Sequence, residues 1–326
     1  MIKRYLLSAC LSIILTGYTQ ADALLTTQVN PNAPTSSYQR SGIPLQTGQI
    51  IVTESPEPLN TLYMLLYPEF SPFIHVGIVE VEGNQAFVYE SSGDYKLGLD
   101  QKPPTDHVTG HVRRITLTEF INESGGTVSF YSPPNGINLA KVIQYSQNQV
   151  SAQTPFDAYF NYTDHSRLYC SEFIAMALEA GGAPPYRTVP MKLNPSLQVV
   201  VNWLKVRDRT ILPVEQLVTP QRWVGTLSQT HTLTALKIDR AIKAELYRRF
   251  TTNQKLGNIL AWKGRGVGFQ PSITTFREKT FATFDDATTY SAAQVLAQVE
   301  EMANKYLGPF TGAKVSVCKI DFSLCP

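Results

Sequence analysis

The amino-acid sequence predicts an α+β fold in which an antiparallel sheet packs on helices, followed by a mainly helical C-terminal region. Between residues 45 and 132 the chain reads as short runs rich in Val, Ile, Tyr and Phe, separated by turn-forming residues. From residue 139 apolar residues recur at helical spacing, and this pattern dominates after residue 230. With 43% hydrophobic and 17% charged residues, the 326-residue chain can bury a sizeable core and is long enough for about two domains.

The first 23 residues have the pattern of a secretory signal peptide. Lys3 and Arg4 precede a short apolar run, and residues 21–23 (ADA) supply a small-x-small cleavage site. The run is shorter than the roughly 20 apolar residues that span a bilayer, so we expect no integral membrane span in the mature chain. Lipoprotein anchoring through Cys10 is the less favoured alternative. The sequence therefore predicts an exported protein, either periplasmic or secreted.

The charge balance argues against one class of partner. The chain has 28 Lys and Arg residues against 26 Asp and Glu residues, which gives a formal net charge of +2. Cleavage after residue 23 would leave 26 against 25. Nucleic-acid-binding proteins usually carry a clustered and strongly basic face, so we expect no nucleic-acid partner. The oligomeric state is unknown at this point.

Export also changes the cysteine count. After cleavage the chain keeps Cys170, Cys318 and Cys325. The last two flank six residues (KIDFSL), and they can close a small loop in an oxidising compartment. We therefore predict a Cys318–Cys325 disulfide, with Cys170 as the odd thiol. The sequence contains no Cys-x-x-Cys pair of the kind that binds zinc.

The elements follow in order along the chain. Residues 24–40 are rich in Asn, Pro, Ser and Thr and are expected to form a linker. Strands are predicted after Gly48 (QIIVTE) and at 73–81, 86–91, 111–117 and 127–132, the second and third joined through Gly-Asn as a hairpin. Helices are predicted around 139–150 and from Cys170 to Gly181-Gly182, where glycine stops the helix. We expect this α+β domain to span residues 41–228.

Residues 229–326 predict a helical accessory region that ends in the tail disulfide. A first helix over residues 231–250 carries five basic residues that can contact anionic envelope polymers or form a solvated face, and the solvated face is favoured. Those residues are Lys237, Arg240, Lys243, Arg248 and Arg249. A cleaner amphipathic helix begins with a capping box of Ser291 and Gln294 and ends at Gly308. The string GRGVGF between them lacks the Lys-Ser/Thr of a phosphate loop and is interpreted as a plain loop.

The predicted hairpin places two ionisable side chains on one face of the sheet. With a two-residue turn at 83–84, paired residue numbers sum to 167, so His75 opposes Ser92 and Gly77 opposes Glu90. His75 and Glu90 then point to the same face as diagonal neighbours, about 7–8 Å apart at the backbone. A carboxylate in that place can accept the imidazole N–H and support its positive charge.

Cys170 supplies a third group. It is predicted to open an apolar helix, where unpaired backbone N–H groups and the helix dipole favour a thiolate and can hold a developing oxyanion. A single cysteine in an apolar segment is commonly inert, but together with His75, Glu90 and the export signal it predicts a catalytic constellation. His165 is the main competing base. Glu172 lies in the first turn, where an acidic residue is also ordinary helix chemistry.

The order of these residues resembles the circularly permuted NlpC-type papain-like cysteine amidases and peptidases, the YaeF/YiiX-like group. The strings HVGIVEV, VYES and YCSEFIAMAL carry the resemblance. TGQIIV and TPFDAYF are also similar, although Gln49 stands where the family has Asp. Most papain-like enzymes have the cysteine before the histidine, whereas the order here is His, Glu, Cys. The resemblance covers about residues 41–225 and implies a permuted papain-like catalytic domain.

The resemblance also implies an activity. Cys170 would be the nucleophile, His75 the general base and acid, and Glu90 the orienting third group, with Tyr169 and Ser171 beside the pocket or oxyanion. The protein would be an exported cysteine hydrolase that cleaves an amide, in a peptide or another amidated cell-envelope substrate, through an acyl-thioenzyme. Neither a metal nor an organic cofactor would be needed.

Two alternatives stay open at this stage. One is an acyltransferase or lipid esterase on the same triad, for which four aromatic residues can supply an apolar groove, although core packing explains them more simply. Those residues are Tyr63, Tyr67, Phe70 and Phe73. The other is a catalytically silent envelope-binding module, against which the intact Cys170, His75 and Glu90 argue.

Overall fold

The computed structural model describes residues 26–56, 58–94, 109–203, 206, 208–253, 258–263, 266–285 and 288–325. The expected signal peptide and Cys10 lie outside these ranges. The strands are β1 (Thr26–Val29), β2 (Tyr38–Arg40), β3 (Ile43–Leu45), β4 (Ile50–Glu54), β5 (His75–Glu82), β6 (Gln85–Asp94), β7 (Thr109–Thr116), β8 (Thr127–Tyr131), β9 (Val189–Pro190), β10 (Thr210–Ile211), β11 (Trp223–Ser228), β12 (Leu260–Lys263) and β13 (Gly266–Phe269). The helices are α1 (Pro58–Leu66), α2 (Leu117–Glu123), α3 (Leu139–Ser151), α4 (Cys170–Ala180), α5 (Pro195–Trp203), α6 (Leu233–Asn253), α7 (Pro271–Phe281) and α8 (Ala292–Leu307).

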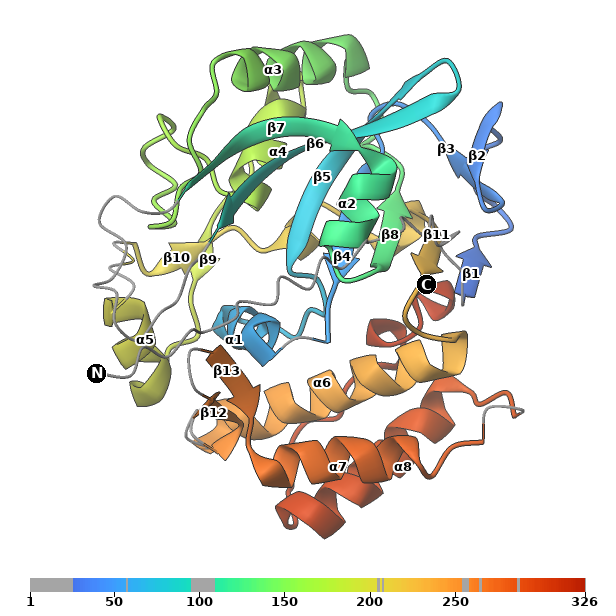
Figure 1. Cartoon of the computed structure of the whole chain (residues 1–326), viewed down its shortest axis with the longest axis vertical. Coiled ribbons are helices and arrows are strands. Elements are labelled where there is room, and N and C mark those ends of the chain that lie inside the picture. Colours follow the sequence, from blue (N-terminus) through green and yellow to red (C-terminus); the bar gives the residue numbers. More distant parts are fainter. Residues whose placement is uncertain are drawn as a thin grey trace, which may run out of the picture.

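A seven-stranded antiparallel sheet forms the centre of the molecule, with strand order β1-β11-β8-β4-β5-β6-β7 (Figure 1). Side chains alternate across it, so that Ile50 and Val52 join a core with α3 and α4, whereas Ile51 joins a core with α2 on the opposite face. Helices therefore cover both faces of the sheet. The predicted α+β class, with a large antiparallel sheet packed on helices, is confirmed.

The β5–β6 hairpin has the predicted register. Glu82 pairs with Gln85, and the ladder continues to Ile78 opposite Tyr89, so that paired residue numbers sum to 167. Gly83 in the turn has a φ of 56°, a left-handed conformation that glycine adopts without steric cost. This turn fixes which residues of β5 and β6 share a face.

Residues expected to form loops contain strands in two places. Within the expected linker at 24–40, β1 pairs with β11 as an edge strand of the main sheet, and β2 pairs with β3. In the string GRGVGF, β13 pairs with β12. The predictions of a linker at 24–40 and of a plain loop at GRGVGF were therefore wrong. Strands at the edge of a sheet or in a two-stranded sheet are held mainly by backbone hydrogen bonds. Their side chains therefore need not show an apolar pattern.

The basic residues of α6 are buried, so neither a solvated face nor a surface for anionic polymers describes them. Each of the five is at most 8% exposed. Their carboxylate partners are Asp321 for Lys237, Glu54 for Arg240, Asp239 for Lys243, and Glu245 for both Arg248 and Arg249. Sequence reasoning failed here because a helix pattern does not show partners that come from distant segments. In contrast, the predicted capping box of Ser291 and Gln294 on α8 is confirmed.

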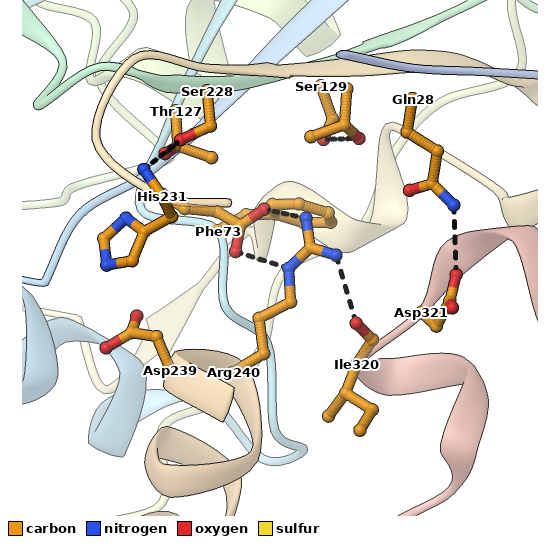
Figure 2. Close-up of polar contacts among 12 residues, drawn as sticks. Gln28, Phe73, Thr127, Ser129, Ser228, His231, Asp239, Arg240, Ile320 and Asp321 are labelled. Atoms are coloured by element: carbon orange, nitrogen blue, oxygen red, sulfur yellow. Dashed lines mark hydrogen bonds and ion pairs between the residues drawn. The ribbon is translucent and has the colours of Figure 1, made fainter. Parts of the chain in front are cut away.

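The end of the chain packs against α6 and the sheet. The Arg240 guanidinium donates to Glu54 Oε2 at 2.8 Å and to the Ile320 carbonyl at 3.1 Å (Figure 2). The Phe322 ring lies 4.1 Å from the Arg240 guanidinium carbon and 5.2 Å from the Phe73 ring, measured to ring centroids. A disulfide joins Cys318 and Cys325 and closes this segment, residues 317–325, which we call the tail loop.

The helical region shares one core with the sheet. A single buried cluster contains Val76 of β5, Phe173 of α4, Ile242 of α6, Phe276 of α7 and Val299 of α8. Helices α6, α7 and α8 therefore pack as part of the same body as the sheet. In the described ranges, no helix combines the length and apolarity needed to cross a membrane.

Candidate active site

His75 and Glu90 meet at one edge of the hairpin. His75 begins β5, and its Nε2 contacts Glu90 Oε2 on β6. The Glu90 side chain is 3% exposed and the His75 side chain 22% exposed. On its other flank the imidazole stacks on Phe120 of α2, with ring centroids 5.8 Å apart. The imidazole is therefore held from two sides, by a carboxylate and by an aromatic ring.

Arg113 on β7 is a second partner of Glu90. It lies opposite Glu90 in the β6–β7 ladder, and its Nε donates to Glu90 Oε1 at 2.8 Å. Its guanidinium also contacts Glu123 at the end of α2. Burial alone would raise the pKa of Glu90, but the hydrogen bond to His75 and the charges of His75 and Arg113 lower it below its ordinary value. Glu90 is thus kept ionised beside the imidazole.

Cys170 comes from α4, whereas His75 comes from β5. Cys170 is the first residue of α4 and half-buried, and its side chain is close enough to His75 to raise the pKa of the imidazole. Both residues line one cavity of about 300 Å³, which we call the Cys170 cavity. The first N–H groups of a helix have no partner within it, so the start of α4 presents donors and a partial positive charge near the thiol.

The environment of His75 favours its charged form. Burial lowers the pKa of His75, but hydrogen bonds to Cys170 and Glu90 and the negative charges of both groups outweigh burial, and the pKa rises to about 10. Negatively charged neighbours favour the charged form of an imidazole in this way. The His75 imidazole therefore lies between the Cys170 side chain and the Glu90 carboxylate.

This raised pKa predicts a pH dependence of stability. The imidazole of an unfolded chain has an ordinary pKa of 6.5, so the contribution of His75 to the free energy of unfolding is complete below about pH 6.5. It should decrease as the pH rises toward about 10, where the folded protein also loses this proton. Urea unfolding across this range should show the decrease in the wild type and a flatter curve for His75→Gln. Parallel curves for the two proteins would contradict the assignment.

Tyr169 and Ser171 both line the Cys170 cavity, but their hydroxyl groups are engaged elsewhere. The Ser171 Oγ donates to the Leu212 carbonyl at 2.7 Å, and the Tyr169 hydroxyl accepts from the Leu212 N–H at 3.3 Å. Both residues are almost fully buried. These bonds fix the start of α4 in place, which leaves backbone N–H groups as the donors that this helix end can offer an oxyanion.

His165 belongs to a different pair. Its Nδ1 lies 2.8 Å from Glu172 Oε1, and the other carboxylate oxygen accepts from the Tyr169 N–H at 3.3 Å. Burial raises the pKa of Glu172 to about 9, against the effect of the Tyr169 hydrogen bond. Glu172 therefore caps α4 and holds His165, whereas His75 is the histidine that lines the cavity of Cys170.

The aromatic residues considered for an apolar groove divide into two sets. Tyr63 and Tyr67 line the Cys170 cavity. Phe70 packs against Tyr247 with tilted rings, and Phe73 packs against Tyr131 and Phe322, so these two belong to the core. The remaining aliphatic and phenylalanine lining of the cavity comes from Ile74, Phe156, Phe160 and Ile211, to which the sequence analysis assigned no role.

The chain was compared with protein-family models, curated proteins and solved structures, and we describe one similar solved structure. No protein-family model matches the chain, and no curated protein matches it. Among solved structures it is similar to one titled "Crystal structure of metalloprotein yiiX from Escherichia coli O157:H7, DUF1105", with 18% sequence identity and a TM-score of 0.42. The match covers 55% of this chain and 95% of that chain. The neighbour bears the name of the YaeF/YiiX-like group.

The neighbour is described as a metalloprotein. Among the described residues of this chain, no group of three or more His, Cys, Asp or Glu side chains is arranged to hold a metal ion.

Proposed function

We propose that this protein is an exported cysteine hydrolase with a permuted papain-like catalytic domain, which cleaves an amide through an acyl-thioenzyme on Cys170. The observation that carries the proposal is the contact chain from Cys170 on α4 to His75 on β5 and Glu90 on β6, with the first two lining one cavity. Nucleophile, base and orienting carboxylate in this sequence of contacts form a triad of the kind used for acyl transfer.

The geometry supports a two-step reaction. The Cys170 thiolate attacks the carbonyl carbon, a C–S bond forms, and the carbonyl oxygen takes the negative charge near the first N–H groups of α4. The tetrahedral intermediate then breaks its C–N bond, and the His75 imidazolium gives its proton to the leaving amine. In the second step His75 takes a proton from water, which attacks the thioester and releases the acid and the thiolate. Glu90, held by Arg113, keeps the imidazole in orientation throughout.

The cellular setting is part of the proposal. The basic start, short apolar run and small-x-small site of residues 1–23 support export. The resemblance to NlpC-type amidases supports a peptide or another amidated component of the cell envelope as substrate, which is an argument by analogy.

A second candidate is acyl transfer or ester cleavage on the same triad. It is favoured by one observation: the cavity beside Cys170 is lined by Tyr63, Tyr67, Phe156 and Phe160, which suit an apolar acyl group. The first step would be unchanged, and an alcohol or amine would replace water in the second. A catalytically silent binding module is less well supported because all three groups of the triad are present and in contact.

Alkylation of Cys170 tests the activated thiolate. We expect iodoacetamide to label Cys170 in the native protein rapidly at about pH 6, where an ordinary thiol with a pKa of about 8.5 reacts slowly. His75→Ala should slow labelling by about tenfold or more, because each pKa unit changes the thiolate population about tenfold. The label is located by peptide mass.

His165→Ala is the matched control, because His165 is also near Cys170 in sequence but pairs with Glu172. It should leave the labelling rate within about twofold of the wild type. If Cys170 reacted only after unfolding, the thiol would be an inert core group and the proposed function would be wrong.

A further inference from the structure

Two cavities of unlike chemistry meet at His75. The imidazole lines both the Cys170 cavity and a larger cavity of about 930 Å³, which we call the polar cavity. Ile74, His75 and Ser92 line both. A molecule bound across the imidazole would therefore place one part in each cavity.

The two linings differ in polarity. The side chains of the Cys170 cavity are mainly aromatic or aliphatic, as described above. Those of the polar cavity carry hydroxyl, amide and charged groups, and they include Thr53, Ser55, His111, Arg113, Asn122 and Glu123. Apolar walls bind apolar groups by excluding water, whereas a wall of donors and acceptors binds groups that return its hydrogen bonds.

The hydroxyl of Thr53 points to a ligand in the polar cavity. Thr53 pairs with His75 across β4 and β5, so the two side chains share one face of the sheet. Its side chain is fully buried, and within the described structure its Oγ1 has no hydrogen-bond partner. A buried hydroxyl without a partner destabilises the protein, so such a group in a cavity wall is suited to meet a donor or acceptor from outside.

The charges around the polar cavity balance one another. The carboxylates of Glu90 and Glu123 both contact Arg113, and Glu90 also contacts His75, which the raised pKa keeps protonated. Two anions thus face two cations, and His111 is the one further titratable group in the described lining. The lining of the polar cavity therefore offers no unbalanced charge to a charged ligand, and it favours an uncharged polar group.

We propose that the Cys170 cavity holds the acyl half of the substrate and the polar cavity holds its leaving group, so that the substrate class is an apolar acyl group joined to an uncharged, hydrogen-bonding amine or alcohol. This inference rests on the proposed function. The acyl half becomes bonded to the Cys170 sulfur when the C–N or C–O bond breaks, so its binding site must contain that sulfur. The leaving nitrogen or oxygen takes the proton of His75, which lines both cavities.

Three hexanoate esters test the inference. The p-nitrophenyl ester reports acyl-enzyme formation, because its leaving group departs without help from a binding site. The glyceryl and pentyl esters carry leaving alcohols of equal heavy-atom count, one polar and one apolar. We expect kcat/KM for the glyceryl ester to exceed that for the pentyl ester by about tenfold or more in the wild type, in keeping with one or two additional hydrogen bonds.

Thr53→Val removes the hydroxyl at nearly constant shape and should lower the glyceryl-to-pentyl ratio of kcat/KM by about fivefold to tenfold. Thr27→Val, the same substitution at an exposed position on β1, should leave that ratio unchanged. If Thr53→Val does not fold, Asn122→Ala at the exposed rim of the polar cavity serves as the second variant.

The outcomes separate the inference from the function on which it rests. If the p-nitrophenyl ester gives no acyl adduct on Cys170, the proposed function fails. If the adduct forms but the glyceryl and pentyl esters react equally, or the ratio is unchanged in Thr53→Val and Asn122→Ala, the inference is overturned and the function stands. A ratio that falls in these variants alone supports the assignment of the two cavities.

Discussion

Replacing Cys170 with alanine is expected to lower turnover of p-nitrophenyl hexanoate by about ten-thousand-fold or more, which is the scale of loss when a member of a catalytic triad is removed. The wild type should release a burst of p-nitrophenol and gain the mass of one hexanoyl group, located by peptide mass at Cys170. The variant should show neither, because the sulfur that accepts the acyl group is absent.

The fold of this variant serves as its own control. Cys170 is half-buried and its substitution removes a single sulfur atom, so the thermal midpoint should stay close to that of the wild type. A folded Cys170→Ala protein that still hydrolyses the ester at the wild-type rate would place the chemistry elsewhere in the chain. That result would remove the central observation of the proposed function.

Replacing Arg240 with methionine is expected to lower the free energy of unfolding by about 3–5 kcal/mol, the usual cost of leaving one member of a buried ion pair without its partner. Arg240 is fully buried, Glu54 is 2% exposed, and the pair joins α6 to β4. The variant also loses the hydrogen bond to Ile320 of the tail loop. Urea unfolding measures the difference.

Two further variants make this prediction specific. Glu54→Gln combined with Arg240→Met also removes the buried carboxylate that has lost its partner. The double variant should recover part of the lost free energy of unfolding. Lys314→Met is the control, because Lys314 is 82% exposed and its pair with Glu300, at 3.5 Å, should contribute no more than about 1 kcal/mol. If Arg240→Met and Lys314→Met lowered the free energy of unfolding equally, the loss of Arg240 would not leave an unpaired buried charge on Glu54.

Local patterns carried most of what the sequence could predict. The Gly-Asn turn set the register of β5 and β6, and that register alone placed His75 and Glu90 on one face. Gly181 and the apolar spacing before it identified α4 and put Cys170 at its start. These inferences depend on residues within one turn or one helix, where the geometry of the backbone limits the possible arrangements.

The sequence could not predict contacts between segments that are far apart along the chain. Arg113 reaches Glu90 from β7, and the chain between β6 and β7 is too long for a turn rule to set their register. The pairing of β1 with β11 and of Arg240 with Glu54 joins residues that lie far apart in sequence. No periodic pattern reports which basic residue will meet which carboxylate. The most consequential misreading, that of α6 as a solvated helix, has this cause.

The Arg240–Glu54 pair also has a consequence for the order in which the protein assembles during synthesis. The two residues are 186 positions apart, which corresponds to roughly 10–40 s of translation at about 5–20 residues per second. Until α6 is available, Glu54 has no guanidinium partner, and its carboxylate is stabilised by water. The contact between β4 and α6 therefore belongs to the later steps of assembly, when Arg240 replaces that water and the tail loop closes over the pair.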